Sequence, residues 1–329
     1  MKTRNLFICI LSVFAMLPFL ETSAQSPPIT IELLTTFDYP GEGNSTQPSK
    51  INDQGDIAGQ FIDSSGVIRG FVRYRDGSFS APIVEPNDAG NNTQARGINN
   101  NGTIVGFYIG SDGAFHGYFL SGDTFTEFDV PGAVNTLVFG INNGGDFVGN
   151  TDDGVTDHGY LSIDGVLTTF SIPGALETDV SSINDAQNSA GFYFDSAVVS
   201  HGFIRKRDGT LIFPIDPPGA TQTLLFGNND RGAKVGRYAD SSGITHGLFF
   251  TDRNNFVGYD FPGATLTSLN GINQAGIICG RYQGADGIGH GIVARVTFRS
   301  EASSVQSQSP ASPARAINSS FSTIRSPLP

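Results

Sequence analysis

Short apolar runs separated by polar, glycine-bearing turns dominate the chain between residues 31 and 298. Clear examples are the runs at residues 136–142, 146–150, 158–162 and 166–172. Asn-Gly, Gly-Gly and Asp-Gly dipeptides stand in the turns between them. Runs of this kind, closed by such turns, are typical of strands in antiparallel hairpins. No helical periodicity extends beyond one turn, so the pattern predicts an all-β structure.

One pattern within these units recurs six times with a fixed internal spacing. A Thr is followed six residues later by an Asn, and seven residues after that by a Gly. The positions are Thr46/Asn52/Gly59, Thr93/Asn99/Gly106, Thr136/Asn142/Gly149, Thr178/Asn184/Gly191, Thr223/Asn229/Gly236 and Thr267/Asn273/Gly280. A period of about 44 residues indicates a propeller, solenoid or linear array, whose units bury apolar surface against their neighbours.

The two ends of the repeat region complement each other. The last unit has only three runs and finishes at residues 291–298, whereas an extra run at residues 31–38 precedes the first unit. That run matches the fourth runs of other units. Pairing of the two ends would close a ring and leave no exposed sheet edge. We therefore predict a six-bladed β-propeller of four-stranded antiparallel blades, closed by the N-terminal strand; a linear β array is the alternative.

The recurring unit also resembles a known repeat. It reads F-D-x-P-G-A-x-x-T-x3-G-I-N-x-x-G-x-I-V-G-x-Y, followed by H-G-F or H-G-Y. Residues 128–133, residues 140–142 and the His116-Gly117-Tyr118 triplet carry it here. It resembles the repeats of bacterial extracellular proteins called the HAF family, over about residues 31–298. The resemblance implies secretion and a repeat fold, and it implies no established activity.

The termini differ in composition from the repeats. Lys2 and Arg4 precede an apolar run at residues 6–20, and small residues up to Ala24 follow it. This order predicts a secretory signal peptide over residues 1–24, because about 15 apolar residues are too few to span a bilayer. We predict the propeller over residues 25–299 and a disordered Ser/Pro-rich tail over residues 300–329. The mature protein is thus expected to be secreted, extracellular or periplasmic.

Charge and cysteine content narrow the range of partners. The chain carries 19 basic and 31 acidic residues, a net charge of −12. Such a surface disfavours nucleic acid and anionic membranes, and no later segment is apolar enough for membrane insertion. Once Cys9 is cleaved off with the signal peptide, Cys279 remains, in the slot that Val148 fills in the third unit. We expect Cys279 to be a buried hydrophobe and the protein to be a monomer held together by packing alone.

The histidines all occupy one slot of the repeat. They are His116, His158, His201, His246 and His290, each followed by Gly. A metal-binding ring is one interpretation, but equivalent residues on neighbouring blades lie too far apart to share an ion at bonds of about 2.1 Å. We interpret the repeated His, Thr and Asn residues as scaffold groups that tie strands to neighbouring loops. No metal or cofactor is predicted.

Searches for catalytic motifs assign no catalytic residue. The chain has no H-E-x-x-H, C-x-x-C, G-x-S-x-G, P-loop or D-x-D-x-D-G calcium loop. Asp152, Asp153 and Asp157 around Gly154 form the nearest acidic cluster. A solvated hairpin turn explains this cluster better than a cation site does.

Departures from the repeat are the best candidates for a ligand site. Arg237-Tyr238 and Arg281-Tyr282 replace the Phe-Tyr pairs of other units, and Arg96 stands where two other units have Phe. If they face the central funnel, they could bind an acidic sugar or a carboxylate. Alternatively, the arginines form surface salt bridges with neighbouring Asp or Glu residues. The candidate ligand-binding residues are Arg96, Arg237, Tyr238, Arg281 and Tyr282.

Three hypotheses for function follow. The first is a secreted, non-enzymatic propeller that binds an extracellular glycan or protein through its loops. The second is a lyase or hydrolase that acts on acidic polysaccharide with its site in the axial funnel. The third is a purely structural surface protein. The fold alone cannot separate them, because propellers support many chemistries.

Overall fold

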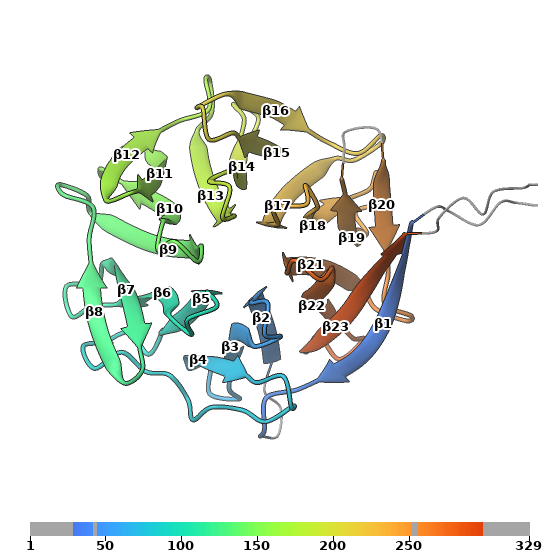
Figure 1. Ribbon diagram of the computed structural model, residues 1–329, viewed down its shortest axis with the longest axis horizontal. Helices are drawn as coiled ribbons and strands as arrows, with labels where there is room; N and C mark the ends of the chain where they lie inside the picture. Colours follow the sequence, from blue (N-terminus) through green and yellow to red (C-terminus); the bar gives the residue numbers. More distant parts are fainter. Residues whose placement is uncertain (1–28, 42–44, 252–254, 299–329) are drawn as a thin grey trace, which may run out of the picture.

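The computed structural model describes residues 29–41, 45–251 and 255–298. These residues form a β-propeller that contains strands and no helix (Figure 1). In the described part of the chain, then, no helix has the length and apolar character needed to cross a membrane. The signal peptide predicted over residues 1–24 and the tail predicted over residues 300–329 lie outside the described residues.

The strands follow the six repeat units in order. The first three units contain β2 (Ser45–Ile51), β3 (Ile57–Ile62) and β4 (Ile68–Arg73); β5 (Gln94–Ile98), β6 (Ile104–Ile109), β7 (Phe115–Ser121) and β8 (Thr124–Phe128); and β9 (Asn135–Ile141), β10 (Phe147–Asp152), β11 (Asp157–Ile163) and β12 (Val166–Phe170). The other three contain β13 (Glu177–Ile183), β14 (Ser189–Phe194), β15 (Ser200–Arg205) and β16 (Leu211–Ile215); β17 (Gln222–Asn228), β18 (Lys234–Ala239), β19 (Thr245–Phe250) and β20 (Phe256–Tyr259); and β21 (Leu266–Ile272), β22 (Ile277–Gln283) and β23 (Gly289–Phe298). β1 (Ile29–Phe37) precedes them.

The prediction of six separate four-stranded sheets is wrong in detail. The strands β5–β8, β9–β12 and β13–β16 each form a four-stranded antiparallel sheet. β2–β4 form a three-stranded sheet, beside which Phe79 and Ile83 make only isolated bridges. The remaining strands belong to one eight-stranded sheet, because a single parallel pairing of Thr245 with Leu266 joins β19 to β21.

The predicted pairing of the two ends is confirmed. β1 runs antiparallel to β23, from Ile29 opposite Phe298 to Phe37 opposite Gly291. In Figure 1, β1 therefore lies along β23 on the outer side of the ring, although the two strands are far apart in the sequence. This pairing excludes the linear array, in which the first and last units would not meet.

The recurring Asn residues, here called the Asn ring, hold the six units around one axis. Each Asn side chain donates through Nδ2 to the backbone carbonyl of the equivalent Asn in the next unit, over 3.0–3.3 Å. Its Oδ1 accepts from a backbone N–H four residues further on and fixes the turn of its own hairpin. Because the sixth bond returns to the first unit, the hydrogen bonds form a closed ring. Its members are Asn52, Asn99, Asn142, Asn184, Asn229 and Asn273.

The recurring Gly marks a tight approach between the first two strands of a unit. A side chain on Gly149 would place Cβ 1.9 Å from the Leu137 carbonyl oxygen, which no larger residue could tolerate. The strand register also shifts by one residue here, between Val148 and Gly149. This shift is a β-bulge, which bends the first strand of the unit locally.

Cys279 is fully buried beside Ile51 and Val293, as predicted.

Candidate functional site

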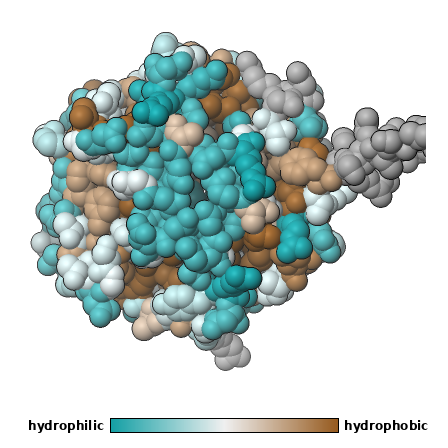
Figure 2. Space-filling view, viewed as in Figure 1, coloured by the Kyte–Doolittle hydropathy of each residue, from teal (hydrophilic) through white to brown (hydrophobic). Residues whose placement is uncertain are grey.

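A cavity of about 250 Å³ lies on the central axis. Every repeat unit contributes to its wall. The lining comes mainly from the first strands of the units, and Gln60, Phe192, Arg237 and Arg281 reach it from second strands. The space-filling view shows hydrophilic residues gathered over the centre of the face seen there (Figure 2). The axis is thus the one place where side chains from all six units can meet a common ligand.

Four basic side chains converge on this cavity. They are Lys50 on β2, Arg96 on β5, Arg237 on β18 and Arg281 on β22. None of the four side chains forms an ion pair or a hydrogen bond with any residue that the structure describes. All four are half-buried, since water reaches them through the cavity. The site therefore combines several positive charges with free donor groups.

Burial and mutual repulsion both act on these cations. Burial and the charge of Arg281 lower the pKa of Arg96 to about 10, and the same two causes lower that of Arg237 to about 10. Burial also lowers the pKa of Arg281. Burial, together with nearby Arg96, lowers the pKa of Lys50 to about 7. Each shift is toward the neutral form, as expected for cations that lack a compensating anion.

Only one carboxyl group among the described residues lies close enough to influence the arginines of the cluster. Asp179 on β13 is 5% exposed and acts on Arg96 from the fourth unit. Burial and a hydrogen bond with Glu177 raise the pKa of Asp179 well above its usual value. The neutral acid is therefore favoured, and Asp179 compensates little of the positive charge.

Aromatic rings form the other side of the cavity. Phe139, Phe192 and Phe226 line it from the third, fourth and fifth units. The Arg96 guanidinium lies 5.2 Å from the Phe139 ring centre, and that of Arg237 lies 5.5 Å from the Phe226 ring centre. These contacts orient two of the cations and leave their edges free. The cavity thus has a basic side and an apolar side.

The polar wall between the sixth and first units is held in place by its own hydrogen bonds. Asn270 Nδ2 donates to the Pro48 carbonyl over 2.6 Å, and Ser268 Oγ donates to Asn270 Oδ1 over 2.6 Å. Gln60 Nε2 donates to Gln47 Oε1 over 3.2 Å. Because these groups are already engaged, they form a rigid support around the free cations.

Two smaller cavities continue the axis beyond the basic one. The middle cavity, of about 70 Å³, is lined by Ile51, Ile98, Ile141, Ile183, Ile272 and Asn228 together with Lys50. The last cavity, also about 70 Å³, is lined by five members of the Asn ring and by residues next to them. The isoleucines narrow the axis, so the basic cavity is separated from the Asn ring by an apolar constriction.

Asn229 is the member of the Asn ring that does not line the last cavity. It keeps both bonds of the ring, because it accepts from Asn184 Nδ2 and donates to the Asn273 carbonyl, each over 3.0 Å. Its neighbour Asn228 lines the cavity instead, from a slot that holds Ile in the other five units. Asn228 Nδ2 reaches the fourth unit and donates to the Asn188 carbonyl over 2.8 Å. The scaffold role expected for Asn229 is therefore confirmed, and this residue is buried beside a second, non-repeated Asn.

Three of the five predicted ligand residues meet in the basic cavity. Arg96, Arg237 and Arg281 line it together. Tyr238 and Tyr282 do not line it, because alternate residues of a strand face opposite sides of the sheet. They stack instead on His246 and His290, with ring centres 4.9 Å apart in both pairs. Pairing of the arginines with surface carboxylates is not observed among the described residues.

Sequence reasoning missed Lys50. This residue occupies the slot where four other units have glycine and the fourth has Ser182. Glycine at this slot lets neighbouring first strands pack closely: a Cβ on Gly271 would lie 2.9 Å from Lys50 Cα. Lys50 could have been found from the sequence, because it is the one long side chain in a slot that otherwise holds Gly or Ser.

The histidines lie far from the axis, near the outer strands. The Nδ1 atoms of His116, His201, His246 and His290 each bond to an Asp, and that of His158 bonds to Ser171, over 2.7–2.9 Å. Each partner directly follows an outer strand, so the bond ties this strand's end to the third strand. The pKa values of His116 and His246 are raised: burial alone would lower them, but their Asp partners outweigh it.

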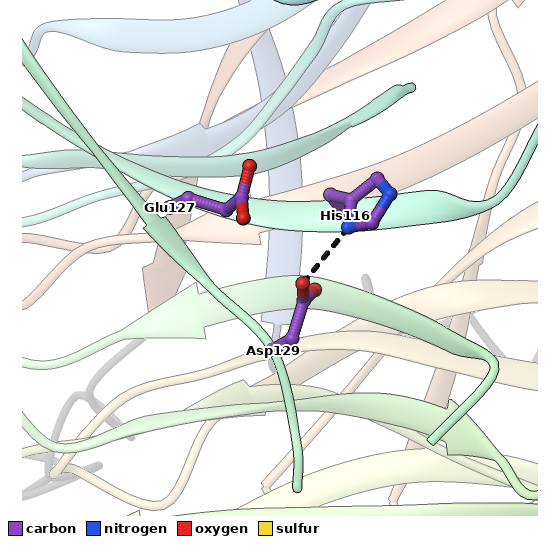
Figure 3. A group of neighbouring side chains, drawn as sticks. All are labelled: His116, Glu127 and Asp129. Atoms are coloured by element: carbon purple, nitrogen blue, oxygen red, sulfur yellow. Dashed lines mark hydrogen bonds and ion pairs between the residues drawn. The ribbon is translucent and has the colours of Figure 1, made fainter. Parts of the chain in front are cut away.

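One histidine belongs to the only group of three potential metal ligands found among the described residues. His116, Glu127 and Asp129 offer ligand atoms within 4.8 Å of one another (Figure 3). However, His116 Nδ1 already bonds to Asp129 over 2.8 Å, and its Nε2 faces Asp112 over 3.2 Å. Glu127 accepts a hydrogen bond from the Tyr108 hydroxyl. The three side chains thus already have hydrogen-bond partners within the protein.

The acidic cluster near Gly154 behaves as a turn. Asp153 Oδ1 accepts from the backbone N–H groups of Val155 and Thr156 over 2.9 and 3.0 Å. Asp152 accepts from the Gly154 N–H over 2.9 Å. These bonds fix the hairpin between β10 and β11.

Comparison with known proteins supports the fold. No protein-family model and no curated protein sequence matches this chain. Among solved structures, a protein assigned as TolB from Agrobacterium tumefaciens has a TM-score of 0.55 at 12% identity, covering 83% of this chain and 98% of its own. A variant of the Aleuria aurantia lectin bound to a fucosylated sugar has a TM-score of 0.49 at 10% identity, covering 77% of this chain and 94% of its own. At 12% identity, the similarity to the first structure shows a shared propeller fold and nothing about function. The second structure has a TM-score below 0.5, so we infer nothing from it.

Proposed function

We propose that this protein is an exported, six-bladed propeller that binds a small acidic ligand, most simply the acidic sugar of an extracellular glycan, in its axial cavity. The observation that carries the proposal is the convergence of Lys50, Arg96, Arg237 and Arg281 without a paired carboxylate among the residues that the structure describes. Buried charges normally acquire a partner, because an unpaired cation loses its hydration for no return. A bound anion supplies that partner.

The count of six blades rests on the ring of Asn bonds. Six equivalent Asn hydrogen bonds link neighbouring units, and the sixth runs from Asn273 back to Asn52 in the first unit. We also infer that the chain is a HAF-type repeat protein, on the basis of residues 128–133 and 140–142 and the His-Gly slot. Export is inferred from the basic, apolar and small segments within residues 1–24.

The shape of the cavity favours a ligand with two unlike sides. Guanidinium groups donate paired hydrogen bonds to a carboxylate, which suits Arg96 and Arg281. The rings of Phe139, Phe192 and Phe226 offer an apolar wall to the C–H face of a sugar ring. A volume of about 250 Å³ is below the usual range for drug-sized ligands, so one sugar acid fits better than a long chain.

The test is calorimetric titration of the purified protein with galacturonate, with galactose as the uncharged control. We expect galacturonate to bind and galactose to bind at least about tenfold more weakly, because the carboxylate makes the charge-assisted bonds. Arg281→Gln should weaken galacturonate binding by a similar factor. Arg231→Ala, which removes an exposed arginine of the fifth unit, is the matched control and should bind normally. Equal affinity for the two sugars would overturn the proposal.

A further inference from the structure

We propose that Lys50 is a nucleophilic amine, which captures a small acid bearing a ketone or aldehyde next to its carboxylate as a reversible imine. This inference rests on the anion site proposed above and names a chemistry for it. The ligand class is a 2-oxo acid, including the 2-oxo forms of sugar acids.

The position of Lys50 is the first argument. The corresponding slot in the other units holds Gly97, Gly140, Ser182, Gly227 and Gly271, and three of these line the middle cavity. Lys50 lines both the middle and the basic cavity, so its side chain spans the boundary between them. The Lys50 side chain therefore lies at the wall shared by the two cavities, and Arg96 is close enough to act on its amine.

The surroundings of the amine are the second argument. Its Nζ has no hydrogen-bond or ion-pair partner among the described residues. A lysine that serves structure is normally paired when it lies so deep. The charged and titratable groups that act on it are Arg96 and the thiol of Cys279. Cys279 is held neutral, since burial raises its pKa to about 12. Desolvation beside another cation is the recognised way to keep a lysine in its free-base form.

The reaction balances without a further reagent. The Nζ lone pair attacks the carbonyl carbon, a C–N bond forms, and the oxygen takes up a proton to give a carbinolamine. Nitrogen then expels this hydroxyl group, which leaves as water after taking a second proton. One of the two protons comes from the attacking amine and one from solvent. Water adds back to the iminium to release the ligand, and nothing is oxidised or reduced.

The arginines supply orientation for this step. Arg96 and Arg281 can hold the carboxylate, which places the adjacent carbonyl carbon toward the cavity floor and Lys50. Fixing both reactants in one cavity converts an intermolecular encounter into an effectively intramolecular one. A neutral aldehyde has no carboxylate for the arginines to hold, so the cavity should not direct it to Lys50. This difference distinguishes reaction in the cavity from nonspecific reaction with any exposed lysine.

The test is reductive trapping. The whole exported protein is incubated with pyruvate and cyanoborohydride, and the modified residue is located by peptide mass spectrometry. The described residues hold two other lysines, of which exposed Lys206 is the internal control for nonspecific labelling. We expect the pyruvate adduct on Lys50 at least about tenfold above Lys206. Propanal, which has no carboxylate, should label Lys206 at least as well as Lys50.

Variants make the result decisive. Lys50→Arg keeps the positive charge but removes the nucleophilic amine, so we expect this variant to form no pyruvate adduct at position 50. Arg281→Gln should reduce pyruvate labelling of Lys50 about tenfold and leave propanal labelling unchanged. Equal labelling of Lys50 and Lys206 by pyruvate would overturn the imine proposal, even if calorimetry shows that galacturonate binds. If the wild-type protein does not bind galacturonate in the calorimetric titration, the proposed anion site itself would be overturned. Because the mapping uses the wild-type chain, the test does not depend on any variant folding.

Discussion

Asn273 Nδ2 donates to the carbonyl oxygen of Asn52 over 3.1 Å, across 221 residues of sequence. This bond is chemically the same as the five others of the ring, but it alone links the last unit to the first. The propeller is therefore closed in two places: by this bond near the axis, and by the pairing of β1 with β23 at the outer edge. The axial cavity exists only while this closure holds.

Replacing an Asn of the ring should destabilise the fold. Asn273→Ala removes the Nδ2 bond to the Asn52 carbonyl, which keeps its bond from the Gly55 N–H, and leaves the turn amide of Ile277 without its side-chain acceptor. We predict a loss of about 1–3 kcal/mol in the free energy of unfolding, the range expected when a buried hydrogen-bonding group loses its partner. Urea titration followed by circular dichroism measures it. Asn101→Ala, at an exposed turn of the second unit, should change stability by no more than about 0.5 kcal/mol.

The recurring Thr offers a comparison within the same molecule. Thr136 Oγ1 accepts from the Val130 N–H over 3.0 Å, and equivalent bonds exist in four other units. In the fifth unit the corresponding residue is Pro217, which has no N–H, and Thr223 Oγ1 is left buried without a partner among the described residues.

Thr→Val substitutions should therefore have opposite effects at the two sites. We predict that Thr136→Val costs about 1–3 kcal/mol, because a buried amide loses its acceptor. Thr223→Val should be neutral or stabilising by up to about 1 kcal/mol, because it removes an unsatisfied hydroxyl of the same volume. Thermal unfolding of both variants checks this, and a similar loss in the two would contradict the capping role.

Replacing a cavity arginine should stabilise the unliganded protein and weaken its binding of the acidic ligand. Arg281 repels both Arg96 and Arg237 in the unliganded protein. We predict that Arg281→Met raises the free energy of unfolding by about 1 kcal/mol, as replacement of buried charges often does. The same variant should lose the thermal stabilisation that galacturonate gives the wild-type protein by mass action. A less stable variant that still responds to galacturonate would contradict this.

The histidine–aspartate pairs should make stability depend on pH. Burial lowers the pKa of His246, but its hydrogen bond to Asp260 and the nearby Asp240 carry it above the ordinary value of 6.5. A raised pKa in the folded state means that the pair contributes fully below pH 6.5. This contribution is lost as the pH rises through the folded-state pKa.

We therefore predict that the free energy of unfolding falls as the pH rises above 6.5 through the folded-state pKa values, in part because of His116 and His246. Urea titrations across this range, in the wild type and in the His116→Gln/His246→Gln variant, measure the slope. The variant should have a shallower slope whatever its absolute stability. Asp260→Asn should reduce the slope in the same direction, and an unchanged slope in both variants would rule out the pairs as its source.

Local chemistry determined much of the architecture from sequence. The period, the Gly-bearing turns and the complementary ends predicted an all-β propeller closed by pairing residues 31–38 with the last strand, because strand and turn preferences are local and the missing strand can be counted. The sequence also marked Arg96, Arg237 and Arg281, since each stands in a slot that holds Phe in two other units.

Tertiary structure alone decided which of these residues meet. Tyr238 and Tyr282 are adjacent in sequence to two of the arginines, but the pleat turns them toward His246 and His290. Lys50 joins the cavity because a ring brings a glycine slot of the first unit beside the arginines of the second and sixth. The merging of two units into one sheet depends on a single contact between Thr245 and Leu266. Such relationships are set by distances through space between separate units, which a linear sequence does not contain.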